Sequence, residues 1–302
     1  MEIKFNRPKG FGEILDLTFR LSKYKFSDFL LINLIFMGPI YLLQVFIQLI
    51  SGVSFFRELG SGDVWYEQIL SSFEDTGTAS LGADLSIIAV SFLSIFLFPV
   101  ASAAILIAIN HMRKSEKYTV GTVIKEAFSR YGPILGSSIL FVLLVIGLVF
   151  IPIIIVVLVG VVGSLANPIV GILMAILLFI GFAIGIGLLL TRWSFYFGSV
   201  VLDDEVLGFS RSRKLSKKRT WALFGLYIVF SLIVSSISYA VEVSFGIFLG
   251  NSVLLSIISG VVSLFTTMIF SVGYAVMYLD AKTRHDADDL KEMIEDYNAV
   301  QS

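Results

Sequence analysis

The sequence contains no cysteine and only two histidines, His111 and His285. Without cysteine the chain forms no disulfide bond, and it offers no thiolate for a metal ion or for redox chemistry. The two histidines lie far apart in the sequence, so their spacing predicts no histidine-based metal site. We also find no phosphate-binding loop and no nucleophile with a neighbouring base. We therefore expect no enzymatic activity, no catalytic residue and no cofactor.

Charged residues are also scarce. They make up 15% of the chain, whereas an average soluble domain contains about 25%. The stretch from Tyr131 to Thr191 holds no charged side chain at all. A helix crosses a bilayer core with about 20 apolar residues, so this stretch is long enough for two crossings. The turn-forming residues from Gly163 to Pro168 predict the break between them, because proline is favoured as the first residue of a helix.

Apolar segments of membrane-crossing length occur six times along the chain. Segments of about 10 alternating residues, which are typical of a membrane β-barrel, are not found. We therefore predict an all-α integral membrane protein with six transmembrane helices, forming a single polytopic membrane domain over residues 1–302. The predicted crossings are 29–51, 86–109, 135–160, 168–191, 221–245 and 252–278.

The distribution of Lys and Arg predicts how the chain is oriented. Arg57 lies in the loop of residues 52–85, between the first two crossings, and every other Lys and Arg lies on the opposite side. Basic residues are concentrated on the cytoplasmic side of membrane proteins, so we expect both termini in the cytoplasm. The charged first 25 residues and the long apolar segment after them argue against a cleaved signal peptide.

An amphipathic segment precedes the first crossing, at residues 9–24. At about 100° per residue, its charged side chains fall on one narrow arc and its apolar side chains on the opposite side. This pattern predicts a helix that lies in the membrane interface. It is also typical of a helix that covers the cytoplasmic ends of a helix bundle. The apolar positions are Phe11, Ile14, Leu15, Leu17, Phe19 and Leu21.

The segment 119–131 repeats this design before the third crossing, and a basic, less regular version precedes the fifth crossing at 204–220. With a shift of 109 residues, the pairs that align are Gly12 and Gly121, Ile14 and Val123, Leu15 and Ile124, and Phe19 and Phe128. We interpret the chain as three repeated hairpins, each a cytoplasmic interfacial helix followed by two crossings. The repeats cover residues 8–110, 118–202 and 203–280, and residues 281–302 form a cytoplasmic tail.

Two local patterns carry a resemblance to a known family. One is Arg7-Pro8-Lys9-Gly10-Phe11-Gly12-Glu13-Ile14-Leu15-Asp16 near the start, and the other is Tyr278-Leu279-Asp280-Ala281-Lys282-Thr283-Arg284 after the sixth crossing. Together with the repeat plan and the Ser210–Lys218 segment, they resemble the membrane domain found before the catalytic domain of some bacterial glycerophosphodiester phosphodiesterases, and also found alone. The resemblance implies a multi-pass protein of the bacterial cytoplasmic membrane.

The chemistry of that family belongs to a separate soluble barrel with paired glutamates, a histidine pair and a divalent metal. This sequence ends shortly after the sixth crossing. We therefore expect the membrane domain alone, and the resemblance implies no enzymatic role for it.

Polar side chains gather on one face of the fifth crossing, at Ser231, Ser235, Ser238 and Glu242, because their spacing follows the helical period. Ser263 belongs to a similar stripe on the sixth crossing. Two such stripes either line a hydrated path or let helices pack closely and hydrogen-bond to one another. Glu242 is either a functional ionisable group within a crossing or a carboxylate that reaches water at the outer interface.

Two further sets of polar residues lie within or beside the crossings. Arg192 ends the fourth crossing, where it either reaches the inner headgroups or is held inside the bundle by a helix that continues past it. Asn33, Gln44 and Gln48 in the first crossing predict hydrogen bonds between helices.

A basic cluster precedes the fifth crossing. Near an anionic leaflet each cation contributes about 1 kcal/mol, so the cluster predicts contact with anionic lipid headgroups. The alternative is ordinary charge that sets the topology. Nucleic acid is a poor ligand for it, because no aromatic residues are interleaved with the basic ones. The cluster consists of Arg211, Arg213, Lys214, Lys217, Lys218 and Arg219.

These patterns favour a non-enzymatic membrane protein over a catalyst. Our first hypothesis is an accessory or scaffold module that acts on a partner protein, on lipid or on a second copy of itself. The alternative is a transporter or permease for a small molecule or lipid, with a polar path along the fifth and sixth crossings.

Overall fold

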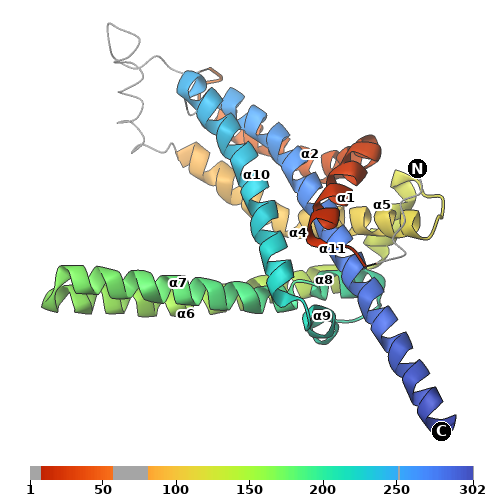
Figure 1. Cartoon of the computed structure of the whole chain (residues 1–302). Coiled ribbons are helices and arrows are strands. Elements are labelled where there is room, and N and C mark those ends of the chain that lie inside the picture. Colours follow the sequence, from red (N-terminus) through yellow and green to blue (C-terminus); the bar gives the residue numbers. More distant parts are fainter. Residues whose placement is uncertain (1–7, 57–80, 251, 302) are drawn as a thin grey trace, which may run out of the picture. The chain divides into compact units, whose positions relative to one another are not determined.

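The structure is a computed structural model that describes residues 8–56, 81–250 and 252–301. Arg7 and Arg57, which entered the predictions above, lie outside these residues. Within them the chain is helical apart from short connections and contains no strand (Figure 1). The predicted all-α class is therefore confirmed.

Among the described residues, six helices are long and apolar enough to cross a membrane, as predicted. They follow the predicted segments closely, although α4 and α6 are longer at both ends and α11 continues well past residue 278. The long helices are α2 (Phe26–Ile50), α4 (Leu81–Arg113), α6 (Tyr131–Ala166), α7 (Pro168–Trp193), α10 (Thr220–Leu249) and α11 (Val253–Gln301).

Shorter helices lie between the long ones. Three of them, α1, α5 and α9, stand directly before a long helix, in the three amphipathic or basic segments. The fourth, α8, follows α7 after a short turn and was not predicted as a separate helix. The short helices are α1 (Phe11–Tyr24), α5 (Val120–Ser129), α8 (Tyr196–Leu202) and α9 (Phe209–Ser216).

The predicted break between the third and fourth crossings is confirmed. Asn167 is extended, and its Oδ1 accepts hydrogen bonds from the N–H groups of Ile169 (3.0 Å) and Val170 (3.4 Å), while Pro168 begins α7. The two helices approach closely just beyond this cap. A Cβ atom on Gly171 would lie 2.4 Å from the backbone nitrogen of Ser164, so a larger residue does not fit without a backbone shift.

The chain divides into two compact units. Unit 1 comprises Met1–Phe11, Arg130–Ile228 and Met277–Ser302, and unit 2 comprises Gly12–Ser129 and Val229–Val276. Both α10 and α11 contribute residues to each unit.

Unit 2 is held together by apolar packing and by hydrogen bonds between its helices. Its core includes the fully buried Phe29 and Ile32 of α2 and the consecutive buried residues Val100–Ile109 of α4. The Asn33 amide donates to the carbonyl of Leu264 at 3.2 Å, and the Gln48 amide donates to the hydroxyl of Ser86 at 3.3 Å. The predicted interhelical hydrogen bonds of Asn33 and Gln48 are therefore confirmed.

Helix α1 divides its apolar side between the protein and the surface. Ile14, Leu17 and Leu21 are buried, whereas Phe11 and Phe19 remain 39% and 40% exposed. Burial of the inner positions supports a helix that covers other parts of the protein. Because these two phenylalanines are exposed, the structure is also compatible with the predicted contact between α1 and a membrane interface, which stays a prediction.

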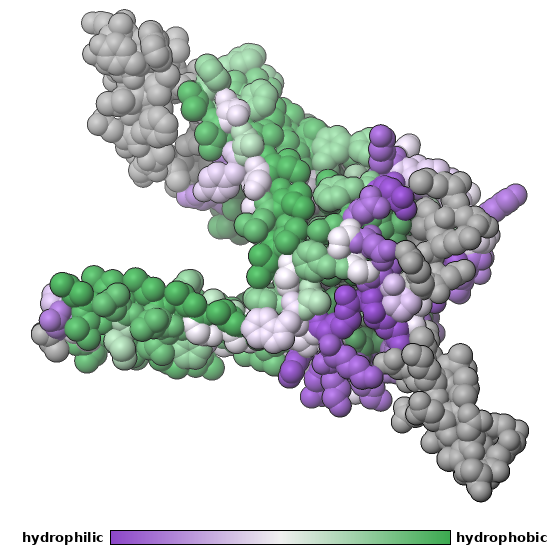
Figure 2. All heavy atoms as spheres, in the orientation of Figure 1, coloured by the Kyte–Doolittle hydropathy of each residue, from purple (hydrophilic) through white to green (hydrophobic). Residues whose placement is uncertain are grey.

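Unit 1 combines a long apolar hairpin with a compact polar base. The hairpin of α6 and α7 is hydrophobic along its length (Figure 2), and side chains such as Phe150 and Ile151 are 62% exposed. At its base, α8 is almost wholly buried. Because lipid solvates such apolar side chains, the exposed hairpin fits a protein that lives in a bilayer.

Candidate functional site

Asp280, on α11 in unit 1, is a buried carboxylate that joins three parts of the chain. Its side chain is 3% exposed, and its Oδ1 accepts the backbone N–H of Lys9 at 2.6 Å. Its Oδ2 accepts from Arg219 Nη1 and from Arg284 Nε, each at 2.9 Å. A buried charge is tolerated only when it is paired and hydrogen-bonded, and Asp280 meets both conditions.

Asp203, directly after α8, forms a second ionic cluster in the same unit. It accepts a hydrogen bond from the Tyr278 hydroxyl at 2.7 Å, forms a salt bridge with Lys282, and lies 3.6 Å from Arg211 Nε. The fully buried Tyr278 ring packs on Gly198, where an added Cβ would lie 2.4 Å from the ring. Glycine at this position therefore allows Tyr278 to reach the carboxylate.

Among the described residues, the two clusters bring two carboxylates together with four cationic side chains, Arg211, Arg219, Lys282 and Arg284. The pKa of Arg219 is lowered first by burial and then by the charge of Arg284, while Asp280 acts in the opposite direction. Arginine stays protonated at neutral pH despite such a shift. Arg219 therefore keeps its positive charge.

Helix α9 is fixed against the end of α7. Gly208 precedes it with φ of 68°, a left-handed conformation in which an added Cβ would lie 2.2 Å from the carbonyl oxygen of Tyr196. Two hydroxyls of α9, those of Ser212 and Ser216, donate to the carbonyl oxygen of Arg192 at 2.8 Å and 3.2 Å. These bonds satisfy a carbonyl at the end of α7 and set the position of α9.

The cations of this segment differ in exposure. Arg211 and Arg219 pair with Asp203 and Asp280, as described above. The other four members of the predicted basic cluster are exposed at the surface: Arg213, Lys214, Lys217 and Lys218. We call this surface of α9 and the α9–α10 connection the basic face. In Figure 2, hydrophilic side chains gather around α9, beside the apolar hairpin of the same unit.

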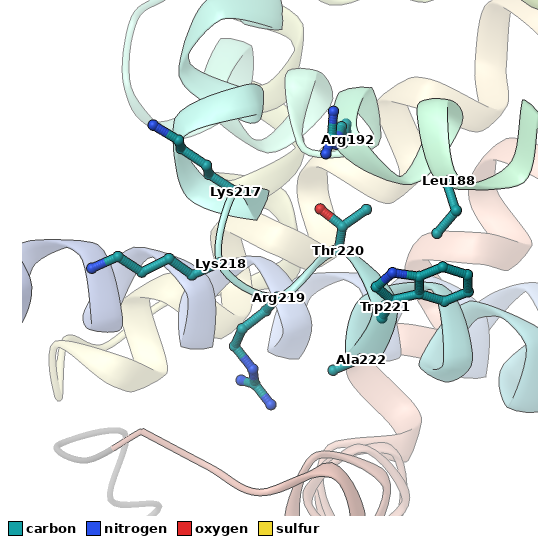
Figure 3. A pocket seen from close by; sticks show the side chains of 8 residues that line it. All are labelled: Leu188, Arg192, Lys217, Lys218, Arg219, Thr220, Trp221 and Ala222. Carbon is teal, nitrogen blue, oxygen red and sulfur yellow. The ribbon is translucent and has the colours of Figure 1, made fainter. Parts of the chain in front are cut away.

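A pocket of about 490 Å³ lies beside the basic face, where α7 ends and α10 begins. Its side chains are arranged by polarity (Figure 3). Lys217 and Lys218 extend on one side, and Leu188 and Trp221 lie on the other. The lining residues are Leu188, Arg192, Lys217, Lys218, Arg219, Thr220, Trp221 and Ala222.

The structure places Arg192 at this pocket and not inside a helix bundle. Helix α7 ends one residue after it, at Trp193, and the Arg192 side chain is exposed. That the arginine reaches toward headgroups stays a prediction. The pocket brings Arg192 together with Lys217, Lys218 and Arg219 of the basic cluster.

The polar residues predicted along the fifth and sixth crossings differ in exposure in unit 2. On α10, Ser231, Ser235 and Glu242 are exposed and Ser238 is partly exposed. Ser263 of α11 is partly exposed, and it belongs to a part of α11 whose neighbours, Leu264 and Thr267, receive hydrogen bonds from Asn33 of α2. Within this unit the α11 stripe therefore supports packing against α2.

Sequence reasoning did not select the two carboxylates of the site. Asp280 and Tyr278 were noted only as part of the family resemblance, and Asp203 was not singled out. Asp280 ends a long charge-free segment, which was a usable signal, because a carboxylate beside a membrane crossing needs partners. The partner Lys9 was not predictable, since it lies 271 positions away and contributes only its backbone.

No group of three or more His, Asp or Glu side chains in the described part of the chain could hold a metal ion. The fold and site thus define an all-α, multi-pass membrane-type protein with a basic face. A family model described as Domain of unknown function (DUF7847) matches residues 28–282, and the chain belongs to that family. The match includes Asp203, Asp280 and the pocket. No curated protein and no solved structure matches the chain.

Proposed function

We propose that this chain is a non-enzymatic accessory or scaffold protein of a bacterial cytoplasmic membrane, which acts through anionic lipid bound at its basic face. The observation that carries the proposal is the row of exposed cations Arg213, Lys214, Lys217 and Lys218, held on a fixed helix beside the apolar hairpin of unit 1. Each such cation contributes about 1 kcal/mol near an anionic leaflet.

The proposed orientation follows from the same charges. With the basic face in the cytoplasm, both termini lie there too, as the distribution of Lys and Arg predicts. The resemblance to the membrane domain of glycerophosphodiester phosphodiesterases supports an accessory role, because in those proteins the chemistry belongs to a different domain.

Transport is the less favoured function. A polar path would require the stripes on α10 and α11 to line one space, but Ser231, Ser235 and Glu242 are exposed on α10 while α11 bonds to α2 near Ser263. Cysteines placed at Ser235 and Ser263 test this alternative. Labelling of both by a small, water-soluble thiol reagent in intact membranes would revive it.

The proposed lipid contact is tested on the purified full chain in detergent micelles. Adding phosphatidylglycerol should raise the midpoint of thermal unfolding more than adding phosphatidylcholine, because only the former carries net negative charge. The difference should shrink as salt is added, since exposed charges are screened. Equal midpoints with the two lipids at low salt would overturn the proposal.

A further inference from the structure

We infer that the pocket between α7 and α10 is a discrete site for the phosphate group of one anionic lipid headgroup. The inference rests on the proposed function and deepens it, because it places one bound headgroup at defined residues where the basic face alone would attract lipid diffusely. The observations are the composition of the pocket, its division into polar and apolar sides, and the bonds that hold its walls.

The charges of the pocket suit a phosphate. Arg192, Lys217, Lys218 and Arg219 line it, and none of the described residues that line it is an Asp or Glu. Arg219 is already paired with Asp280, so the other three cations are the principal partners for an anion. The pocket also lies at the start of α10, where the backbone N–H groups and the helix dipole favour an anion. The Thr220 hydroxyl already donates to the carbonyl of Ser216 at 3.0 Å, so the donors for a ligand are the cations.

The apolar wall favours a lipid over free phosphate. Leu188 lies one helical turn before Arg192 on α7, and Trp221, the second residue of α10, is 68% exposed. Both lie on the side of the pocket away from Lys217 and Lys218 (Figure 3). A tryptophan beside several cations is typical of the headgroup level of a bilayer. At that level a lipid presents its phosphate and the first carbons of its chains.

The walls are fixed before any ligand arrives. The Arg192 carbonyl holds Ser212 and Ser216, which joins the end of α7 to α9. Arg219 is fixed by Asp280, which in turn binds the Lys9 backbone and Arg284. The helices that carry the cations are therefore already in place, and only the exposed side chains of Arg192, Lys217 and Lys218 lose conformational freedom on binding.

Two variants with equal charge loss separate the pocket from diffuse attraction. R192Q/K217Q removes two cations from the pocket, and R213Q/K214Q removes two exposed cations of α9 that do not line it. The full chain in detergent micelles is titrated calorimetrically with soluble dihexanoyl phosphatidylglycerol, with dihexanoyl phosphatidylcholine and with inorganic phosphate.

We expect R192Q/K217Q to weaken phosphatidylglycerol binding at least about tenfold, which corresponds to about 1.4 kcal/mol. R213Q/K214Q should weaken it less than R192Q/K217Q does, because a single soluble lipid presents one headgroup to the pocket and not the anionic leaflet near which the whole basic face acts. Equal weakening by the two variants would overturn the pocket and leave the proposed function standing. Equal binding of both lipids by the unchanged protein would overturn both proposals.

Two further comparisons keep the result interpretable. Inorganic phosphate that binds as tightly as the lipid would overturn the role of Leu188 and Trp221. If R192Q/K217Q does not fold, the single exposed substitutions Lys217→Gln and Lys214→Gln replace the pairs, and the same difference between pocket and control is expected.

Discussion

Asp280 is a buried carboxylate that connects three parts of a chain in which charged residues are scarce. It joins the N-terminal segment, the start of α10 and α11 through three hydrogen bonds in unit 1. Removing a partner from a buried ionic cluster is costly because the remaining charges stay desolvated. The same carboxylate also positions Arg219, a lining residue of the pocket.

Asp280→Asn should therefore lower the free energy of unfolding by about 3 kcal/mol, because it leaves Arg219 and Arg284 without a neutralising charge. Asp16→Asn is the matched control. Asp16 forms a salt bridge with Arg20 one turn along α1, and its side chain is 64% exposed, so its loss should change the free energy by less than about 0.5 kcal/mol. Chemical unfolding of both variants in detergent checks the difference, and equal values would contradict the assigned role of Asp280.

At the scale of elements, α1 and α5 share more than a sequence pattern. Under the shift of 109 residues, buried Ile14 aligns with buried Val123, and exposed Phe19 aligns with exposed Phe128. The agreement fails at Leu17 and Leu21, which are buried and align with the exposed Glu126 and the partly exposed Arg130. The matching burial supports the predicted repeat, which remains a prediction.

The joints after these two helices are also alike. Lys25 leads into α2 with φ of −115° and ψ of 34°, and Arg130 leads into α6 with φ of −111° and ψ of 18°. A single non-helical residue thus separates two helices in both places. α1 has 14 residues and α5 has 10, so the two copies differ in length by about one helical turn before the joint.

The turn between α6 and α7 gives a prediction at this scale. Gly171→Ala should lower the free energy of unfolding by about 1 to 3 kcal/mol, because the new Cβ meets the backbone of Ser164 and forces the helices apart. Gly185→Ala on the same helix is the control, since an added Cβ there meets no atom within 4 Å. Thermal unfolding should separate the two variants, and similar midpoints would show that the hairpin tolerates the extra atom.

At the scale of the whole molecule, the features that could be predicted from the sequence are those set by residues close together in the chain. The lengths of apolar segments predicted the six long helices, and Asn167-Pro168 predicted the break between α6 and α7, because helix length and capping are set by neighbouring residues. The ion clusters depend on residues far apart in the sequence, such as Asp203 and Lys282. Their pairing requires knowledge of the tertiary fold, and the same holds for the pocket that Arg192 shares with the basic cluster.

The orientation of the whole chain can be tested directly by labelling single introduced cysteines, because the sequence contains no other cysteine. Ser51→Cys and Ser210→Cys both replace exposed serines. Ser51 ends the first predicted crossing on the outer side, and Ser210 lies in a segment predicted to be cytoplasmic. In spheroplasts, a membrane-impermeant maleimide should label Ser51→Cys, and it should label Ser210→Cys only after permeabilisation. The reverse pattern would place the basic face outside the cytoplasm.

The bond between Lys9 and Asp280 also has a consequence for biosynthesis. A ribosome releases Lys9 early and Asp280 only near the end of the chain, 271 positions later. Arg219 therefore remains without its carboxylate until α11 has been made. A nascent chain stalled before that point carries all the apolar helices that precede α11 but lacks a completed ionic cluster, and this difference distinguishes a finished molecule from a truncated one.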